Sequence, residues 1–267
     1  MRNTFAVILC LLAAQGQAQE GSWPDLRAQL YDDAYLMQAG DTIRIDAPYR
    51  STEDARTDIG ARITAPVGQA LDSVTVILDE NPMPVSAVFH FAQPVDRFDF
   101  GMTMRVNGPT PLHVVSGTEQ GQFFVAESFV KTSGQGACAA PPGTDPELAL
   151  ASLGQIGIDL PAPSADDLLA ALPDATATRP MTIDISHPSH SGMQMDQISL
   201  LYIPARFIDT ITVDLDGQPY VTITGSISLS ENPRITLSIP ATARVADVTM
   251  TDTDGTRTSM HAILQGS

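Results

Sequence analysis

The sequence predicts an all-β protein made of two immunoglobulin-like β-sandwich domains, joined by a Pro/Ala-rich linker with short helices and preceded by a short N-terminal helix. Two observations predict this fold class. Short runs of apolar and β-branched residues, several alternating with polar ones, recur at the spacing of about 8–12 residues that is typical of such sandwiches. Prolines and alanines gather in residues 139–180, which divides these runs into two similar groups. A single larger barrel is the alternative fold.

The first eighteen residues have the pattern of a secretory signal. Arg2 supplies a charged start, Phe5–Ala14 form an apolar run, and Gly16-Gln17-Ala18 offers small residues for cleavage. The apolar run is too short to cross the hydrocarbon core of a bilayer, roughly 30 Å thick, as a helix. We therefore expect that residues 1–18 are removed, that the mature protein is periplasmic, and that no part of it inserts into a membrane.

The first predicted domain opens with Ser22-Trp23-Pro24-Asp25. This run suits a helix start, because the serine of a capping box accepts a hydrogen bond from the first turn and proline is tolerated there. Extended runs separated by turn residues then predict seven strands. They are Thr42–Asp46, Ile59–Thr64, Val74–Asp79, Val85–Phe91, Phe98–Val106, Leu112–Val115 and Gln122–Lys131.

The linker is predicted to contain short helical pieces at Glu147–Ser152 and Ala165–Ala171. After it, Asp216-Gly217 and Asp254-Gly255 predict tight hairpins, because Asp-Gly suits turns whose two central residues have positive φ. Strands are predicted at Met181–Ser186, Gln197–Ile203, Ile208–Leu215, Tyr220–Ser230, Ile235–Ile239, Val245–Thr251 and Thr256–Leu264. The predicted boundaries are 19–143 for the first domain, 144–178 for the linker and 179–267 for the second domain.

The composition is strongly acidic, with 31 Asp and Glu against 14 Lys and Arg and a formal net charge of −17. Such a surface repels nucleic acid and anionic membranes, so neither is an expected partner. The sequence shows no phosphate-binding loop, no dinucleotide fingerprint and no nucleophile elbow. We therefore expect no cofactor and a protein that is not itself an enzyme.

Loss of the signal also removes Cys10 and leaves Cys138 as the only cysteine. An odd thiol in a secreted protein either pairs with another molecule or stays reactive. Its small neighbours favour an exposed thiol on a flexible arm, and a buried structural cysteine is the alternative. The acidic composition should raise the pKa of this thiol. The predicted arm residues are Gly134, Gly136, Ala137 and Ala139.

These motifs resemble a known family. The first half resembles SoxY, and the second half resembles SoxZ, of bacterial thiosulfate oxidation. The chain as a whole is similar to fused SoxYZ-like carriers found beside quinoprotein dehydrogenases. The residues that carry the resemblance are Leu78-Asp79-Glu80-Asn81-Pro82-Met83-Pro84 and Phe129-Val130-Lys131 leading to Cys138, then His187-Pro188, Gly192, Ile203-Pro204-Ala205 with Phe207-Ile208, and Ser230-Glu231-Asn232-Pro233.

The resemblance implies an immunoglobulin-like fold in each half and a swinging cysteine, Cys138, that carries covalently bound sulfur intermediates. Its implied partners are sulfur-oxidising enzymes or cytochromes of the Sox type, or an exported quinoprotein dehydrogenase, with small sulfur species as cargo. In SoxY the cysteine ends the chain within Gly-Gly-Cys-Gly-Gly. Here Cys138 lies between alanines and a whole domain follows it, so an arm fixed at both ends should reach less far.

Two other functions fit parts of the sequence. His187, His190, Met193 and Met195 lie close together, and imidazole and thioether groups suit copper. The simpler interpretation of this cluster is a loop in which the methionines pack and the histidines face water. The chain is alternatively a docking module for an exported quinoprotein, in which Cys138 has no role.

Overall fold

The computed structural model describes residues 22–134, 136–161 and 177–264. The predicted signal and the helical piece at 165–171 lie outside these residues. The first half contains the helix α1 (Trp23–Tyr31), the 3-10 turns η1 (Gly40–Thr42) and η2 (Ala137–Ala139), and the strands β1 (Leu36–Gln38), β2 (Ile43–Asp46), β3 (Thr57–Thr64), β4 (Leu71–Leu78), β5 (Val85–Val95), β6 (Arg97–Met104), β7 (Thr110–Thr118) and β8 (Phe123–Val130).

The rest of the described chain begins with a second short helix and then continues almost entirely in strands. It contains α2 (Pro146–Ala151), β9 (Ile156–Asp159), β10 (Thr178–Ile185), β11 (Ile208–Leu215), β12 (Gln218–Thr224), β13 (Arg234–Pro240), β14 (Val245–Asp252) and β15 (Arg257–Ile263). Asp145 caps α2 by accepting hydrogen bonds from the N–H groups of Glu147 and Leu148. The all-β prediction with two sandwiches and a short N-terminal helix is confirmed.

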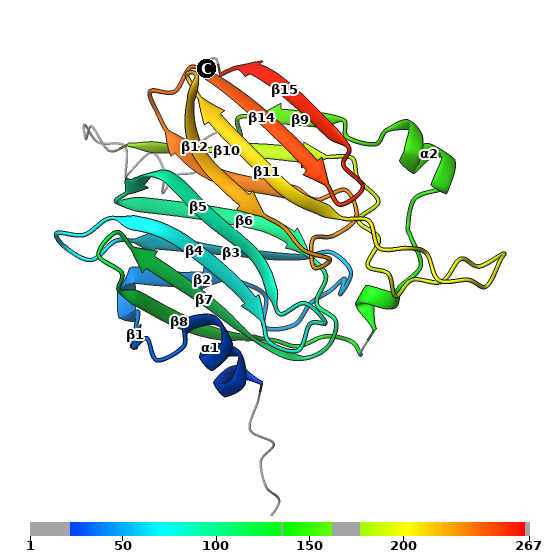
Figure 1. Ribbon diagram of the computed structural model, residues 1–267, viewed down its shortest axis with the longest axis horizontal. Helices are drawn as coiled ribbons and strands as arrows, with labels where there is room; N and C mark the ends of the chain where they lie inside the picture. The colour runs from blue at the N-terminus through cyan, green and yellow to red at the C-terminus, as the bar shows by residue number, and fades with distance from the viewer. Residues whose placement is uncertain (1–21, 135, 162–176, 265–267) are drawn as a thin grey trace, which may run out of the picture.

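The strands form two stacked sheets, and each sheet runs through both halves of the chain (Figure 1). The nine-stranded sheet has the order β1-β8-β7-β4-β5-β12-β11-β14-β15, and the six-stranded sheet has the order β2-β3-β6-β13-β10-β9. The halves meet where β12 pairs with β5, as at Ile223 and Phe89, and where β13 pairs with β6, as at Leu237 and Phe100. The two sandwiches are therefore joined edge to edge.

Pairing at these edges also joins the two hydrophobic interiors. One cluster of buried residues extends from Ile59 and Phe98 in the first half to Ile183 and Val248 in the second. Burial on this scale makes apolar contact the main force holding the halves together. Joining the sheets also covers strand edges that would otherwise be open to pairing with other chains.

Several local predictions are wrong for physical reasons. Residues 197–203 are not a strand, because the carboxylate of Asp196 accepts the N–H groups of Ile198 and Ser199 and folds the segment into a turn. The strand predicted at Tyr220–Ser230 ends at Thr224. Ser22 makes no capping bond, and its hydroxyl instead donates to Glu80 at 2.7 Å.

The two Asp-Gly pairs also differ from each other. Asp216 and Gly217 both have positive φ, as the hairpin prediction requires, whereas Gly255 alone has it in the second pair. There the carboxylate of Asp252 accepts the N–H groups of Asp254 and Thr256 and shapes a longer loop. Within the ranges that the structure describes, no helix has the length and apolarity needed to cross a membrane.

Candidate functional site

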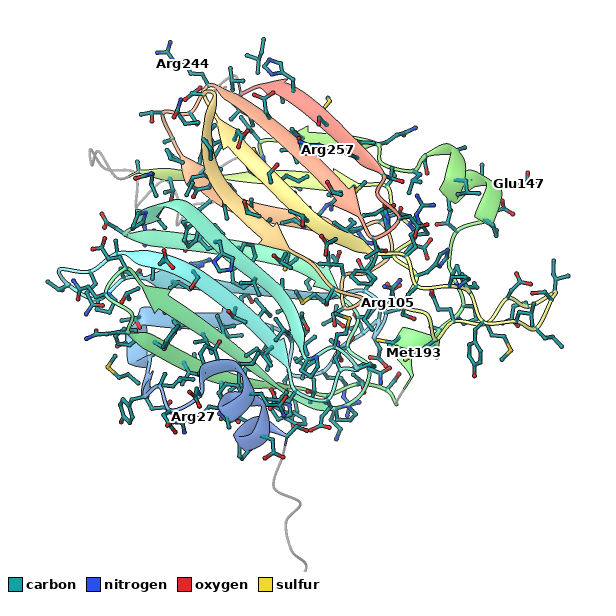
Figure 2. All side chains as sticks on the ribbon, viewed as in Figure 1. Arg27, Arg105, Glu147, Met193, Arg244 and Arg257 are labelled. Atoms are coloured by element: carbon teal, nitrogen blue, oxygen red, sulfur yellow. The ribbon has the colours of Figure 1, made fainter. Side chains whose placement is uncertain are left out.

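Cys138 lies in η2, in contact with the loop that follows β10. Figure 2 labels Arg105 and Met193, which lie close together at one end of the joined sandwich. The first half holds Cys138 through Asn107. The carbonyl of Asn107 accepts the N–H of Gly136 at 2.8 Å, and its side-chain Oδ1 accepts the N–H of Cys138 at 3.1 Å. Gly136 has a φ of 101°, a conformation that suits glycine and turns the chain into η2.

The second half covers the same segment from the other side. Ser191 donates a hydrogen bond from its hydroxyl to the carbonyl of Cys138, and Gln194 donates from Nε2 to the carbonyl of Ala140 at 3.0 Å. Both side chains are buried, with 6% and 1% of their surface exposed. The loop after β10 therefore binds the cysteine segment directly and shields it from solvent.

The expectation of an exposed thiol is wrong, because Cys138 is 0% exposed. The small flanking residues allow the loop from the second half to approach the backbone closely, and they thereby bury the sulfur. Burial raises the pKa of the Cys138 thiol to about 11, and the nearby Arg105 charge only partly opposes this rise. The predicted direction is confirmed, although its first cause is burial and not the overall acidity.

Asn81, from the Glu-Asn-Pro turn of the first half, holds the backbone of Asn107 through a hydrogen bond. It is 4% exposed, and its Oδ1 accepts the N–H of Asn107 at 2.9 Å. Its Nδ2 donates to the carbonyl of Arg105 at 2.8 Å and to the hydroxyl of Ser228 at 2.9 Å. A continuous chain of hydrogen bonds thus runs from the Asn81 turn through Asn107 to Cys138.

The matching turn of the second half holds the chain just after Cys138. The carboxylate of Glu231 accepts the N–H of Gly143 at 2.7 Å and the N–H of Thr144 at 2.9 Å. Arg56 reaches this turn from the first half and donates to the carbonyls of Glu231 and Asn232 at 2.8 and 2.9 Å. The Glu-Asn-Pro sequence, which occurs once in each half, therefore holds the chain on both sides of Cys138.

Arg105 is a residue of this site that the sequence did not single out, and the same is true of Arg56, Asn107, Ser191 and Gln194. Arg105 follows β6, is 2% exposed, and donates from Nη1 to the carbonyls of Leu229 and Ile227 at 2.6 and 3.3 Å. Burial lowers the pKa of Arg105, while the charges of Cys138 and Glu231 oppose that shift. A lone arginine ending the apolar run Phe98–Val106 was the available signal in the sequence.

A cavity of about 290 Å³ adjoins the cysteine segment. Ala137 and Ala140, on either side of Cys138, contribute to its wall together with Arg105. Its other lining residues are Glu53, Ala55, Arg56, Pro141, Gly143, Thr144, Gln194, Glu231 and Asn232. The cysteine segment therefore borders a partly open space that both halves of the chain build, although Cys138 itself is not among the residues that line it.

The two histidines of the candidate copper cluster lie against other polar partners. Nδ1 of His187 accepts the N–H of Ser189 at 2.9 Å, so the proton of the neutral ring lies on Nε2, which faces Asp252 at 3.4 Å. Burial lowers the pKa of His187 to about 4. Nδ1 of His190 lies 3.1 Å from the side-chain oxygen of Gln194. Among the described residues, no three His, Cys, Asp or Glu side chains gather as a metal site.

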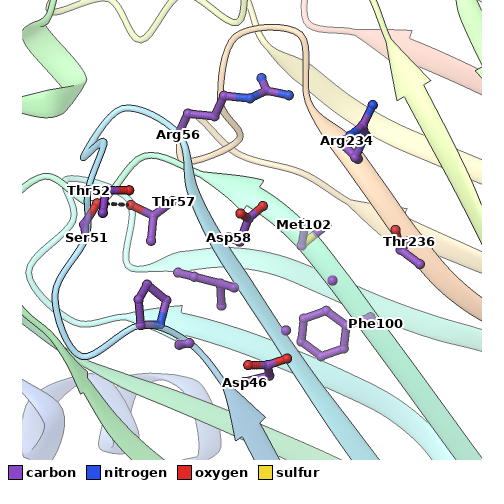
Figure 3. Close-up of a pocket in the computed structure, with 15 residues that line it drawn as sticks. Asp46, Ser51, Thr52, Arg56, Thr57, Asp58, Phe100, Met102, Arg234 and Thr236 are labelled. Carbon is purple, nitrogen blue, oxygen red and sulfur yellow. Dashed lines mark hydrogen bonds between the residues drawn. The ribbon is translucent and has the colours of Figure 1, made fainter. Parts of the chain in front are cut away.

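Another opening, of about 480 Å³, lies on the six-stranded sheet near the same turn (Figure 3). It is lined by Asp46, Asp58, Phe100 and Arg234, among others. Arg56 lines this opening, and its side chain extends from there toward the loop before β13 (Figure 3). No residue of the cysteine segment (136–144) lines the opening, so it lies outside the candidate site.

Comparisons with known proteins agree with the two halves of the chain. A family model for the sulfur oxidation protein SoxY matches residues 27–138, and a model for the sulphur oxidation protein SoxZ matches residues 172–262. A search of curated proteins found no match.

Three solved structures illustrate the structural similarity. The sulfur carrier protein SoxY from Chlorobium limicola f thiosulfatophilum is 19% identical, with a TM-score of 0.34, over 42% of this chain and 96% of its own. A superoxide reductase (neelaredoxin) from Ignicoccus hospitalis is 13% identical, with a TM-score of 0.29, over 34% and 80%. A β-glucuronidase from Parabacteroides merdae is 12% identical, with a TM-score of 0.23, over 83% and 24%.

Proposed function

Because this chain belongs to the SoxY and SoxZ families of sulfur oxidation proteins, with a SoxY domain followed by a SoxZ domain, we propose that it is a periplasmic carrier that holds a sulfur intermediate covalently on Cys138. It presents the bound group to partner enzymes and catalyses no step itself. The observation that carries the proposal is the position of Cys138. It ends the SoxY match and is held by residues of both domains.

The closed site suits storage of the thiol and not its reaction. The thiolate is the reactive form of cysteine, and a pKa of about 11 leaves little of it near neutral pH. A buried sulfur is also out of reach of a partner's active site. Reaction therefore requires the cysteine segment to leave the loop of the SoxZ domain, which breaks the bonds from Ser191 and Gln194.

Binding of a partner enzyme supplies the means to open this site. The loop that covers Cys138 continues into a projecting hairpin, where Met195 pairs with Tyr202. Ile198 is 94% exposed at its tip, with Leu200, Leu201 and Tyr202 also exposed. A partner that binds these apolar side chains buries their surface and displaces the connected segment that contains Ser191 and Gln194.

Loading with thiosulfate illustrates the chemistry. The thiol loses its proton, an S–S bond forms to the outer sulfur of thiosulfate, and two electrons pass to a partner cytochrome or quinoprotein dehydrogenase. The product is the cysteine S-thiosulfonate, with one proton released. Partner enzymes then process the sulfonate end and finally return the thiol, following ordinary sulfur redox chemistry.

The test is the mass of the exported protein, purified without reductant and measured before and after dithiothreitol. We expect a sulfur-containing adduct that reductant removes and that peptide mapping assigns to Cys138. The Cys138→Ser variant is the control and should fold normally without an adduct. An unmodified thiol that also resists thiosulfate, sulfide and polysulfide in the presence of an electron acceptor would overturn the proposal.

A further inference from the structure

The cavity beside η2 contains two arginines without a carboxylate partner. No Asp or Glu of the described residues lies within 4.0 Å of the guanidinium groups of Arg56 or Arg105. Each uses Nη1 to bind two backbone carbonyls, which leaves Nε and Nη2 without hydrogen bonds to any described residue. Both residues line the same cavity of about 290 Å³.

The surroundings of Arg105 make this arrangement unusual. A charge that is 98% buried is costly unless a counter-ion or strong hydrogen bonds stabilise it, yet this one has only neutral carbonyl partners. Two carboxylates do line the cavity. Glu231 is bound to the N–H groups of Gly143 and Thr144, and Glu53 is exposed to solvent. Neither carboxylate lies within the 4.0 Å of an ion pair with Arg105, and the charge of Glu231 acts on it only from a greater distance.

We propose that this cavity binds the sulfonate end of a sulfur oxyanion through Arg105 and Arg56, and that it does so for the group carried on Cys138. The inference rests on the proposed carrier function and names the class of cargo. Ala137 and Ala140 place the cavity wall on both sides of Cys138 in the chain. A cysteine S-thiosulfonate ends in a tetrahedral anion, and the planar guanidinium binds such oxyanions through paired N–H donors.

This arrangement also accounts for how so acidic a protein retains an anion. With a net charge of −17 the overall field is unfavourable to a sulfonate, so retention requires a local positive charge shielded from salt. A simple persulfide lacks the sulfonate oxygens that accept the paired N–H donors of a guanidinium group. The cavity therefore favours thiosulfonate over persulfide as the resting cargo.

The same anion can reach the cavity from two sources, free in solution or attached to Cys138, and two measurements separate them. For the free anion, the full-length Cys138→Ser protein is titrated with sodium thiosulfate by calorimetry at low ionic strength, with sodium chloride as the reference. We expect saturable binding that weakens at least tenfold in Cys138→Ser proteins carrying Arg56→Gln or Arg105→Lys. Arg27→Gln, an exposed arginine on α1, is the matched control and should change nothing.

For the attached anion, the protein is loaded with thiosulfate and the half-life of the Cys138 adduct in dilute reductant is followed by intact mass. We expect Arg56→Gln and Arg105→Lys to shorten it about tenfold. Arg105 is buried, so its replacement can impair folding. Ala140→Leu therefore provides a second test, because it fills part of the cavity while both arginines are retained. It should shorten the half-life as well.

The outcomes distinguish this proposal from the carrier function. If an adduct forms on Cys138 but its half-life and the free-anion affinity are the same in all variants, the anion site is wrong and the carrier function stands. If no adduct forms, yet the Cys138→Ser protein binds thiosulfate in an arginine-dependent way, the anion site stands and the carrier function fails. Arginine dependence of the half-life alone, without free binding, supports an anion site that acts only on the attached group.

Discussion

The two Glu-Asn-Pro turns have the same three residues, yet the structure uses them differently. Asn81 is 4% exposed, and both polar atoms of its side chain form hydrogen bonds inside the protein. Asn232, in contrast, is exposed and has a positive φ of 45°. Asn81 holds the backbone that leads to Asn107 and also binds Ser228 of the SoxZ domain. Asn232 acts at the surface, where its Oδ1 accepts the N–H of His187 at 3.0 Å.

The difference shows how one short motif can serve both sides of a junction. The Asn81 turn holds the chain before and at Cys138, and the Glu231-Asn232 turn holds the chain after it. The first does so through buried hydrogen bonds, which are costly to leave unmade, and the second through bonds that water can replace. We therefore expect substitutions in the first turn to lower the free energy of unfolding more than substitutions in the second turn.

Replacing Asn81 tests the buried turn and has the largest expected effect. Asn81→Ala leaves the N–H of Asn107 and the carbonyl of Arg105 without partners, and each buried group costs about 1–3 kcal/mol. We expect the free energy of unfolding to fall by about 3 kcal/mol, measured by urea denaturation. Asn81→Asp keeps the acceptor for Asn107 but places a buried carboxylate oxygen against the carbonyl of Arg105, so it should lose at least as much. A change below about 1 kcal/mol for Asn81→Ala would contradict the comparison.

The second prediction concerns pH and the loop that Asn232 supports. The folded protein holds the pKa of His187 at about 4, below that of the unfolded chain, so the unfolded state binds the additional proton as pH falls. The contribution is fully present above about pH 6.5 and is lost as pH falls toward 4, by roughly 3 kcal/mol. Asp252 adds in the same direction: burial alone would raise its pKa, but hydrogen bonds from Arg206 and Thr256 lower it.

Urea denaturation at a series of pH values from 4 to 7 measures this slope. His187→Asn removes the titrating group and should flatten the profile, although the variant is less stable at neutral pH. Equal slopes in the two proteins would show that His187 does not control the acid stability of the SoxZ loop.

The overall architecture followed from the sequence more readily than the site. Alternating apolar runs and Asp-Gly pairs are local signals, so most strands were predicted within a few residues. The pairing of β5 with β12 depends on contacts between residues more than a hundred positions apart, and no local pattern encodes it. Cys138 could be singled out as the candidate carrier residue from its local sequence, but its burial by Ser191 and Gln194, which are more than fifty positions away, could not be foreseen.

The third prediction concerns access to the thiol. Gln194→Ala removes the bond to the carbonyl of Ala140, and a hydrogen bond of about 0.5–1.5 kcal/mol corresponds to a change of up to about tenfold in the population of the open state. Alkylation of Cys138 by iodoacetamide, followed by intact mass, should therefore be about three to ten times faster. Gln197→Ala, an exposed glutamine in the hairpin, is the matched control. Unchanged alkylation in Gln194→Ala would mean that other contacts keep the site closed.

The smallest effect is expected at Asn232, where two variants separate the side chain from the backbone. Asn232→Gly loses the bond to the N–H of His187 but accepts the positive φ without strain, so we expect a loss below about 1 kcal/mol. Asn232→Ala loses the same bond and also strains the backbone, which adds about 1 kcal/mol. The difference between the two unfolding free energies therefore measures the backbone strain of alanine, less the extra freedom that glycine has in the unfolded chain. If both variants cost as much as Asn81→Ala, the two turns would be energetically equivalent and the distinction between a buried and a surface turn would fail.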